Sequence, residues 1–139
     1  MLERSFDTGR INEVINHPEV RPFVGPISYG EVDAAPVVAK PEDWFLMGDH
    51  GGFLLSWSSP GVREIHTFVL PEGRGRWAAE ARAEMLDYAR ANGTHTLWTK
   101  IDPAHRHTVQ FARRGGMQPT EEMITMLGTP YQIYMMELE

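Results

Sequence analysis

Hydrophobic positions recur with a helical spacing in one long stretch of the chain, between Trp77 and Asn92. The apolar residues inside it lie three or four positions apart: Ala78, Ala81, Met85 and Ala89. This spacing gathers them on one face of a helix, and the glycine just beyond, Gly93, is a common helix stop. The stretch therefore predicts a helix that packs on the rest of the molecule along its alanine-rich face.

A different pattern precedes this helix. The run Ile65–Leu70 is β-branched, aromatic or apolar at every position except His66, which is typical of a buried strand. Between the strand and the helix, Pro71–Arg76 carries one proline, two glycines and two arginines, which is the composition of a turn. A strand that runs through such a loop into a helix can hold an anion, because free backbone N–H groups and the positive end of the helix dipole meet there.

The remaining pattern predicts further elements on both sides of this unit. Before it we expect a helix from Asp7 or Thr8 to Ile15, a helical turn at 20–24, a long irregular segment at 25–40 with room for a short helix, and strands at 43–47, 53–57 and 62–70. After it we expect a strand at 94–101, a helix at 104–114, and strands at 123–127 and 131–138. The strand–helix–strand unit from Val62 to Ile101 predicts a parallel strand pair, and the hairpins on either side are antiparallel. The fold class is therefore α/β (α+β), with a mixed sheet of about six strands and helices on both faces.

Composition narrows the class of protein. The 139 residues fit one domain over 1–139, and 42% apolar with 23% charged residues is typical of a globular chain. No apolar run is long enough to span a membrane, and the N-terminus lacks a signal-peptide pattern. The absence of cysteine excludes disulfides and thiolate metal sites, and together these features favour the cytoplasm.

The number and position of charged residues bear on two kinds of partner, nucleic acids and anionic ligands. The net charge of −6 argues against non-specific nucleic-acid binding, which needs a positive face. Most of the lysines and arginines nevertheless lie between Arg63 and Arg114, around the glycine-bearing loop. The sequence therefore predicts a local site for a small anionic ligand. A nucleotide triphosphate is disfavoured because no Gly-Lys-Ser/Thr follows the glycines.

The element order and the central loop together resemble the GNAT superfamily of acyl-CoA-dependent N-acetyltransferases. The loop of that family reads Gln/Arg-x-x-Gly-x-Gly/Ala between a strand and a helix. Arg74 stands here at the first position and Ala79 at the last, whereas Trp77 replaces the middle glycine. A tryptophan places a Cβ and a large ring where the backbone is expected to approach a ligand closely.

A second family motif lies at the next helix, and it is weaker here. The family pattern is Asn-x-x-Ala-x-x-Leu/Phe-Tyr-x-x-x-Gly-Phe, against which Phe111 and Gly116 match well. The asparagine position holds His105, and the tyrosine that often serves as general acid is Ala112. The resemblance covers the chain from Trp44 to Leu138, and its short form is similar to acetyltransferase-like proteins carried by phages.

The resemblance implies a cofactor, a reaction and a set of binding residues. Acetyl-CoA would be the co-substrate, with its pyrophosphate on the loop and its pantetheine arm along the preceding strand, and an amine would attack the thioester directly. The implied cofactor-binding residues are Phe68, Val69, Leu70, Arg74, Gly75, Arg76, Trp77, Ala78, Ala79 and His105. His105 would either cap the helix start or touch the cofactor. The acceptor pocket would come from the N-terminal region, Asp7 to Lys40, and the acceptor itself stays unidentified.

Such a reaction needs a base for the amine and a proton donor for the thiolate. Glu64 and His66 are two residues apart on the strand, so they share one face, and either can be the base. The alternatives are a solvent-facing glutamate and a hydrogen-bonded core histidine. Tyr134, or else Tyr131, can replace the missing acid, and because their parity differs at most one of them faces the site. The competing interpretation of these tyrosines is simple packing.

Three other interpretations of the sequence concern a metal site, the methionines and a protein without catalysis. His95, His105 and His107 invite a metal site, but we predict none, because a closed zinc site needs three or four ligands and the chain has no cysteine. The methionine-rich C-terminal part is consistent with adaptable packing or a homodimer contact. The main alternative to an acetyltransferase is a GNAT-like protein that binds CoA or a partner without catalysis, which Trp77 and Ala112 favour.

Overall fold

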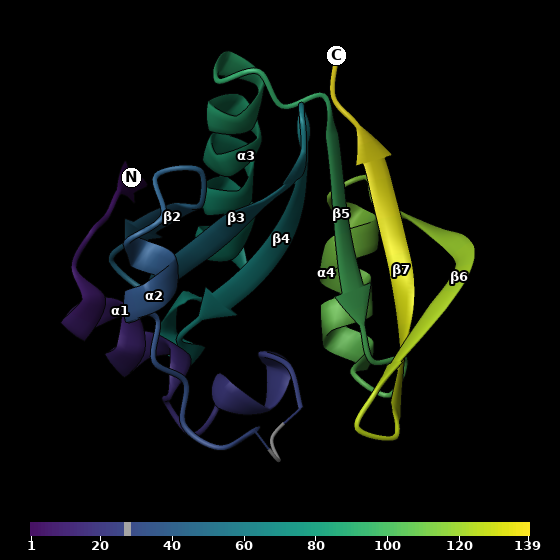
Figure 1. Cartoon of the computed structure of the whole chain (residues 1–139), viewed down its shortest axis with the longest axis horizontal. Helices are drawn as coiled ribbons and strands as arrows, with labels where there is room; N and C mark the ends of the chain where they lie inside the picture. The colour runs from purple at the N-terminus through teal and green to yellow at the C-terminus, as the bar shows by residue number, and fades with distance from the viewer. Residues whose placement is uncertain (27–28) are drawn as a thin grey trace.

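The computed structural model describes residues 1–26 and 29–139. Its centre is one seven-stranded sheet with the strand order β1-β2-β3-β4-β5-β7-β6 (Figure 1). The strands are β1 (Glu3–Arg4), β2 (Trp44–Gly48), β3 (Gly51–Ser59), β4 (Val62–Val69), β5 (Thr96–Ile101), β6 (Gln118–Met126) and β7 (Thr129–Glu137). The helices are α1 (Thr8–Ile15), α2 (Ala35–Val38), α3 (Arg76–Ala91) and α4 (Arg106–Arg114), with short 3-10 turns η1 (Arg21–Phe23) and η3 (Pro71–Gly73).

The predicted fold class is confirmed, and the strands differ from the prediction most at β1, at β6 and at β3, which spans Gly51–Ser59 instead of 53–57. The sheet has seven strands rather than about six, because the two residues of β1 pair with β2 and are too few to leave a periodic pattern. The strand β6 begins at Gln118 instead of Met123, since Gln118 and Pro119 pair with β7 before an irregularity ends at Met123. Consecutive polar residues inside that irregularity conceal the strand in the sequence.

Only one strand pair in the described sheet is parallel. β4 and β5 run in parallel on either side of α3, whereas every other neighbouring pair is antiparallel. The predicted strand–helix–strand unit is therefore confirmed. The parallel pair also divides the sheet into an N-terminal half-sheet (β1 to β4) and a C-terminal half-sheet (β5, β7 and β6).

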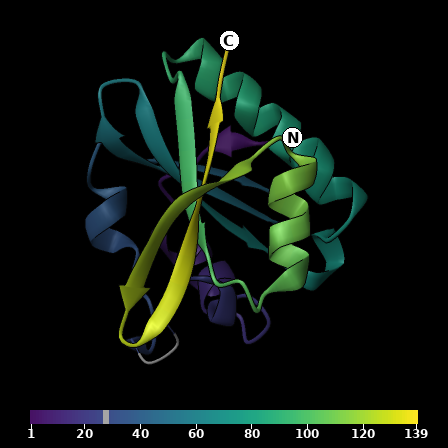
Figure 2. The same cartoon turned by 90° about the vertical axis from the view of Figure 1, so that its right-hand side faces the viewer.

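Two cores lie on opposite faces of the sheet. The larger one joins the alanine face of α3 and Ala112 of α4 to residues such as Phe53 and Leu97, so α3 and α4 cover the same face. The smaller one joins Ile11 and Val14 of α1 to Phe68 of β4 on the other face. Figure 2 shows α3 and α4 together on one side, with α2 on the other. The predicted helix cover on both faces is thus present.

The cover is uneven across the two half-sheets. In Figure 1, α1 and α2 lie in front of the N-terminal half-sheet, while no helix of the described chain lies in front of β5, β7 and β6. The C-terminal half-sheet is therefore packed on one face by α4 and open on the other. Among the described helices, none is long and apolar enough to cross a membrane.

Candidate functional site

The sheet splits open between β4 and β5. These strands pair only through Val62–Thr96, Arg63–Leu97 and Glu64–Trp98, after which their ladder ends. The Thr99 hydroxyl then donates to the Ile65 carbonyl at 2.9 Å, so the backbone of Ile65 points toward β5. Because backbone groups alternate along a strand, those of Thr67 and Val69 also point into the opening. The end of β4 therefore offers an unpaired backbone edge inside the sheet.

The loop after β4 connects this unpaired edge to the start of α3. The Leu70 N–H is already bound, because it donates to the His50 carbonyl at 2.8 Å. Gly75 is the N-cap of α3 with φ of 103°, a conformation that favours glycine, and no side chain caps the helix. The first helical N–H groups, from Arg76 to Ala78, therefore lack an intrahelical acceptor. Together with the dipole of α3, they can bind an anion.

Trp77 does not fill the loop, although it replaces the family glycine. Its indole packs edge-on against the His50 ring with a centroid distance of 5.2 Å. It also lies so close to Gly48 and Gly73 that a Cβ on either would come within about 3.0 Å of the ring. The ring is thus held against the β2–β3 hairpin, and Trp77 supports the loop through its side chain while its backbone belongs to the first turn of α3.

The two arginines of the loop are placed differently. The Arg74 guanidinium donates to the Glu19 carbonyl and lies 5.9 Å from the centroid of the Phe23 ring. Arg76 is solvent-exposed and pairs with Glu80 at 3.0 Å within α3. The predicted loop charges are therefore both present at the helix start, and Arg74 also ties the loop to the N-terminal segment.

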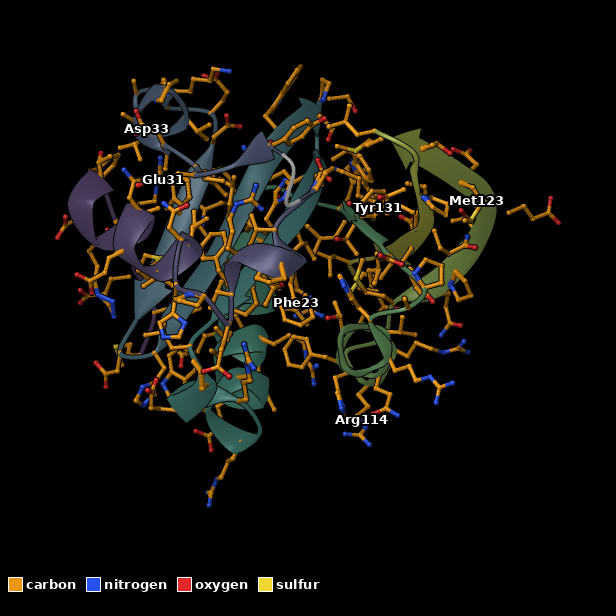
Figure 3. All side chains as sticks on the ribbon, turned by 90° about the horizontal axis from the view of Figure 1, so that it is seen from below. Phe23, Glu31, Asp33, Arg114, Met123 and Tyr131 are labelled. Carbon is orange, nitrogen blue, oxygen red and sulfur yellow. The ribbon has the colours of Figure 1, made fainter. Side chains whose placement is uncertain are left out.

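His105 occupies the N-cap position of α4, but its side chain makes no capping hydrogen bond. The prediction that it caps the helix is therefore wrong. Its ring instead packs edge-on against Phe23 at 4.7 Å, which connects α4 to the N-terminal segment. Figure 3 shows Phe23 between the N-terminal elements and α4. Contact of His105 with a cofactor stays a prediction.

Glu64 and His66 share one face of β4, as their spacing predicts, and they form a charged cluster with Lys100 of β5. His66 Nε2 lies 3.3 Å from Glu64 Oε1, and the Lys100 ammonium donates to Glu64 Oε2. Burial raises the pKa of Glu64, but the hydrogen bonds and charges of His66 and Lys100 outweigh it, so the net pKa is lowered. Glu64 is therefore an anion at neutral pH and a weak base, and it is neither solvent-facing nor unpartnered.

The two candidate tyrosines lie on opposite faces of β7, as their parity predicts. Tyr134 is buried in the larger core with Ala112, on the side of α3 and α4. Tyr131 is buried on the other side, and Figure 3 shows it between the two half-sheets. Burial raises the pKa of Tyr131, with smaller contributions from Asp102 and Tyr29.

Neither Lys100 nor Trp98 is among the site residues that the sequence predicts. Both lie on the same face of β5, and Trp98 stands opposite Glu64 in the parallel register. Side chains alternate between the two faces of β5, so Lys100 and Trp98 share a face. That this is the face of Glu64 follows only from the register of β5 with β4, which the sequence does not reveal. Across residues 1–26 and 29–139, no group of three His, Asp or Glu side chains could hold a metal ion, and His95, His105 and His107 do not form one.

Two hollows lie on the surface of the described part of the chain. One, of about 410 Å³, is lined by Asn16, Arg21, Gly30 and Glu31. The guanidinium of Arg21 is occupied there by backbone carbonyls, including that of Gly30 at 2.7 Å. The other, of about 260 Å³, lies on the open face of the C-terminal half-sheet.

No family model and no curated protein sequence matches this chain. Solved structures do match it over nearly its whole length. YncA of Salmonella typhimurium, described as a candidate acetyltransferase with its cofactor acetyl-CoA, is 16% identical with a TM-score of 0.76, over 100% of this chain and 94% of its own. A candidate GNAT acetyltransferase from Desulfovibrio desulfuricans is 16% identical with a TM-score of 0.66, over 100% of this chain and 99% of its own.

The chain has the GNAT fold. A spermidine N-acetyltransferase chimera of Vibrio cholerae SpeG and hSSAT also matches, at 13% identity and a TM-score of 0.73, over 99% of this chain and 96% of its own. The resemblance predicted from the sequence is thereby confirmed for the fold. In this GNAT fold, the split between β4 and β5 and the uncapped start of α3 lie next to each other along the chain.

Proposed function

We propose that this chain binds acetyl-CoA in the split between β4 and β5 and transfers the acetyl group to an amine. One observation carries the proposal: the β4–β5 ladder ends at Glu64, one short strand segment and one loop before the uncapped start of α3. A ligand with a long polar arm and a phosphate group fits that succession. YncA, which shares the fold, is described with acetyl-CoA as its cofactor.

The cofactor would be held mainly by backbone groups. Its pyrophosphate would accept hydrogen bonds from the free N–H groups of Arg76 to Ala78, because the Ala79 N–H already donates to the Gly75 carbonyl at 3.1 Å, and Arg74 and Arg76 would add positive charge. Its pantetheine amides would pair with the free edge of β4 at Thr67 and Val69. Phe68 contributes through its side chain, which fixes the strand in the smaller core. This places the thioester near the point where the strands separate.

The charged cluster supports His66, rather than Glu64, as the base. With Nε2 bound to the Glu64 carboxylate, a neutral His66 keeps Nδ1 as a proton acceptor. The amine nitrogen would attack the thioester carbonyl, so that a C–N bond forms, the C–S bond breaks, and the amine proton moves to Nδ1. Glu64 would then position the imidazole and stabilise its charged form.

Tyr134 is the proposed proton donor for the leaving thiolate. It lies with Ala112 in the core under α4, so it can serve the region where the family tyrosine is missing. His66 and Tyr134 lie on opposite faces of the sheet, and an attacking amine and a leaving thiolate occupy different sides of the reacting carbon. Tyr134 would regain its proton from solvent after the thiol is released.

A second candidate function is cofactor binding without transfer. Ala112 favours it, because this buried residue offers no hydroxyl at the position of the family acid. Release of free CoA thiol across a panel of amines separates the two. Tight binding of acetyl-CoA without thiol release for any amine supports the binding protein.

A pair of glycine variants tests the cofactor site. Gly75 and Gly93 lie at opposite ends of α3, both have positive φ, and neither has an atom within 4 Å of an added Cβ. Alanine strains the backbone at either position by about 1–3 kcal/mol. Gly75→Ala alone is expected to weaken acetyl-CoA binding, by about tenfold, because it displaces the N–H groups of the loop.

Isothermal titration calorimetry with acetyl-CoA measures this difference, and thermal unfolding checks that both variants lose similar stability. If Gly75→Ala and Gly93→Ala bind acetyl-CoA equally well, the phosphate site lies elsewhere. If the wild-type protein produces no heat with millimolar acetyl-CoA, the proposed function is wrong.

A further inference from the structure

The open face of the C-terminal half-sheet carries a small apolar hollow. Its volume is about 260 Å³. The lining residues come from three neighbouring strands: Trp98, Glu122, Ile124, Ile133 and Met135. Its walls are thus one aromatic and three aliphatic side chains, and Glu122 is its single charged group. No helix of the described chain covers it, as Figure 1 indicates for this face.

Trp98 fixes one wall of the hollow and links it to the charged cluster. Its indole N–H donates to the Ser58 hydroxyl at 2.9 Å, which holds the ring in place. The Lys100 ammonium lies 5.6 Å from the centroid of that ring and also donates to Glu64. The hollow and the Glu64–His66 pair therefore occupy the same face of the sheet, and Trp98 stands opposite Glu64 in the register of β4 and β5.

We infer that this hollow binds the apolar body of the acceptor, which is a primary amine carrying one aromatic ring or an aliphatic group of similar size. The inference rests on the proposed function, because it places the amine of that molecule beside His66. The size agrees: a cavity of about 150 Å³ can hold a benzene ring, so this hollow has room for a ring and a short tail. It is below the usual range of drug-sized sites, which begins at about 300 Å³.

The charge of the hollow selects among amines. Glu122 attracts a cationic ligand and repels one with a carboxylate, while the Lys100 charge is compensated by Glu64. A linear polyamine would leave the three aliphatic walls and Trp98 without an apolar partner. We therefore expect phenethylamine to be a better acceptor than either spermidine or phenylalanine, which carries a carboxylate beside its amine.

The first experiment compares these three amines on the full chain with saturating acetyl-CoA. Release of free CoA thiol gives kcat and KM for each. The kcat/KM for phenethylamine should exceed that for spermidine by about tenfold or more, because burial of a phenyl ring adds that much binding free energy. A spermidine value equal to or above that of phenethylamine overturns the inference and leaves the proposed function intact.

The second experiment fills the hollow. Ile124 lies on its wall and is 37% exposed, so Ile124→Trp adds bulk without opening the core. Met123, the adjacent residue of β6, is 49% exposed, and strand alternation directs it to the other face, so Met123→Trp is a matched control. Figure 3 labels this residue on β6. Ile124→Trp should raise KM for phenethylamine about tenfold with little change in kcat.

Isothermal titration calorimetry distinguishes a defect in acceptor binding from a defect in cofactor binding, because it measures the affinities for phenethylamine and for acetyl-CoA separately. Support requires that Ile124→Trp loses phenethylamine binding, that Met123→Trp keeps it, and that both retain wild-type affinity for acetyl-CoA. If the two variants behave alike, or if phenethylamine neither binds nor reacts with a protein that binds acetyl-CoA, the hollow is not the acceptor site. Failure of the wild-type protein to bind acetyl-CoA overturns the proposed function itself.

Discussion

The N-terminal and C-terminal half-sheets differ in how they are packed. The first is enclosed, with α1 on one face and α3 on the other, and Phe45, Phe53 and Phe68 are almost fully buried in it. The second has α4 on one face, while Ile124 and Met135 remain more than a third exposed on the other. Under the proposed function, the enclosed half-sheet would hold the cofactor and the open half-sheet would face the acceptor.

The largest expected effect tests this difference in packing. Phe53 is 0% exposed, so Phe53→Ala should lower the free energy of unfolding by about 3–5 kcal/mol through lost burial and a cavity. Ile124→Ala should lower it by less than about 1 kcal/mol, because the side chain is already partly in water. Denaturant unfolding measures both. Equal losses would mean that the two half-sheets are packed to the same degree.

Each half-sheet carries one proposed catalytic group, His66 on β4 and Tyr134 on β7. His66→Ala and Tyr134→Phe should each lower kcat by about a hundredfold, the usual contribution of a general base or acid. Because the lowered pKa of Glu64 keeps it ionised, the acid limb of the pH–rate profile should disappear in His66→Ala and persist in Glu64→Gln. Loss of the acid limb in Glu64→Gln alone would make the glutamate the base.

The smallest expected effect concerns the ionic contact across the split. The pKa of Glu64 in the folded protein lies below its ordinary value of 4.5. Its stabilising contribution is therefore present above that ordinary value, and it is lost as the pH falls through the lowered folded value. The free energy of unfolding should decline more steeply on acidification in the wild type than in Glu64→Gln.

A second glutamate provides the control for this acid effect. Glu80 also pairs with a cation, Arg76, but its side chain is 61% exposed, whereas that of Glu64 is 13% exposed. Screening by solvent makes the exposed pair weak, so Glu80→Gln should follow the wild-type curve. Denaturant unfolding between about pH 6 and pH 3 compares the three proteins, a range that brackets the ordinary carboxyl pKa. Identical curves for all three would show that Glu64 does not join the two half-sheets.

Much of the fold follows from patterns that neighbouring residues create. The alanine spacing of α3 and the apolar run of β4 predict their elements because each pattern is generated by a local period. The short strand β1 and the start of β6 escape this reasoning for the same reason. They exist through pairing with β2 and β7, which a local window does not contain.

The candidate site also has one part that local sequence signals predict and another that they do not. The sequence predicts the loop from Arg74 to Ala79, since glycines and a helix start are local signals. It does not predict that the Trp77 ring turns onto the hairpin, because His50 and Gly48 lie far away in the chain. It also misses Lys100 and the packing of His105 on Phe23, because both depend on which strand or segment lies alongside.

The unpaired end of β4 lies in an unusual place for an open strand edge. Open strand edges normally lie at the rim of a sheet, where another chain can add to them. Here the unpaired edge at Thr67 and Val69 lies inside the sheet, between β4 and β5, which pair with each other only where both strands begin. Under the proposed function, acetyl-CoA would complete this part of the sheet in place of a strand.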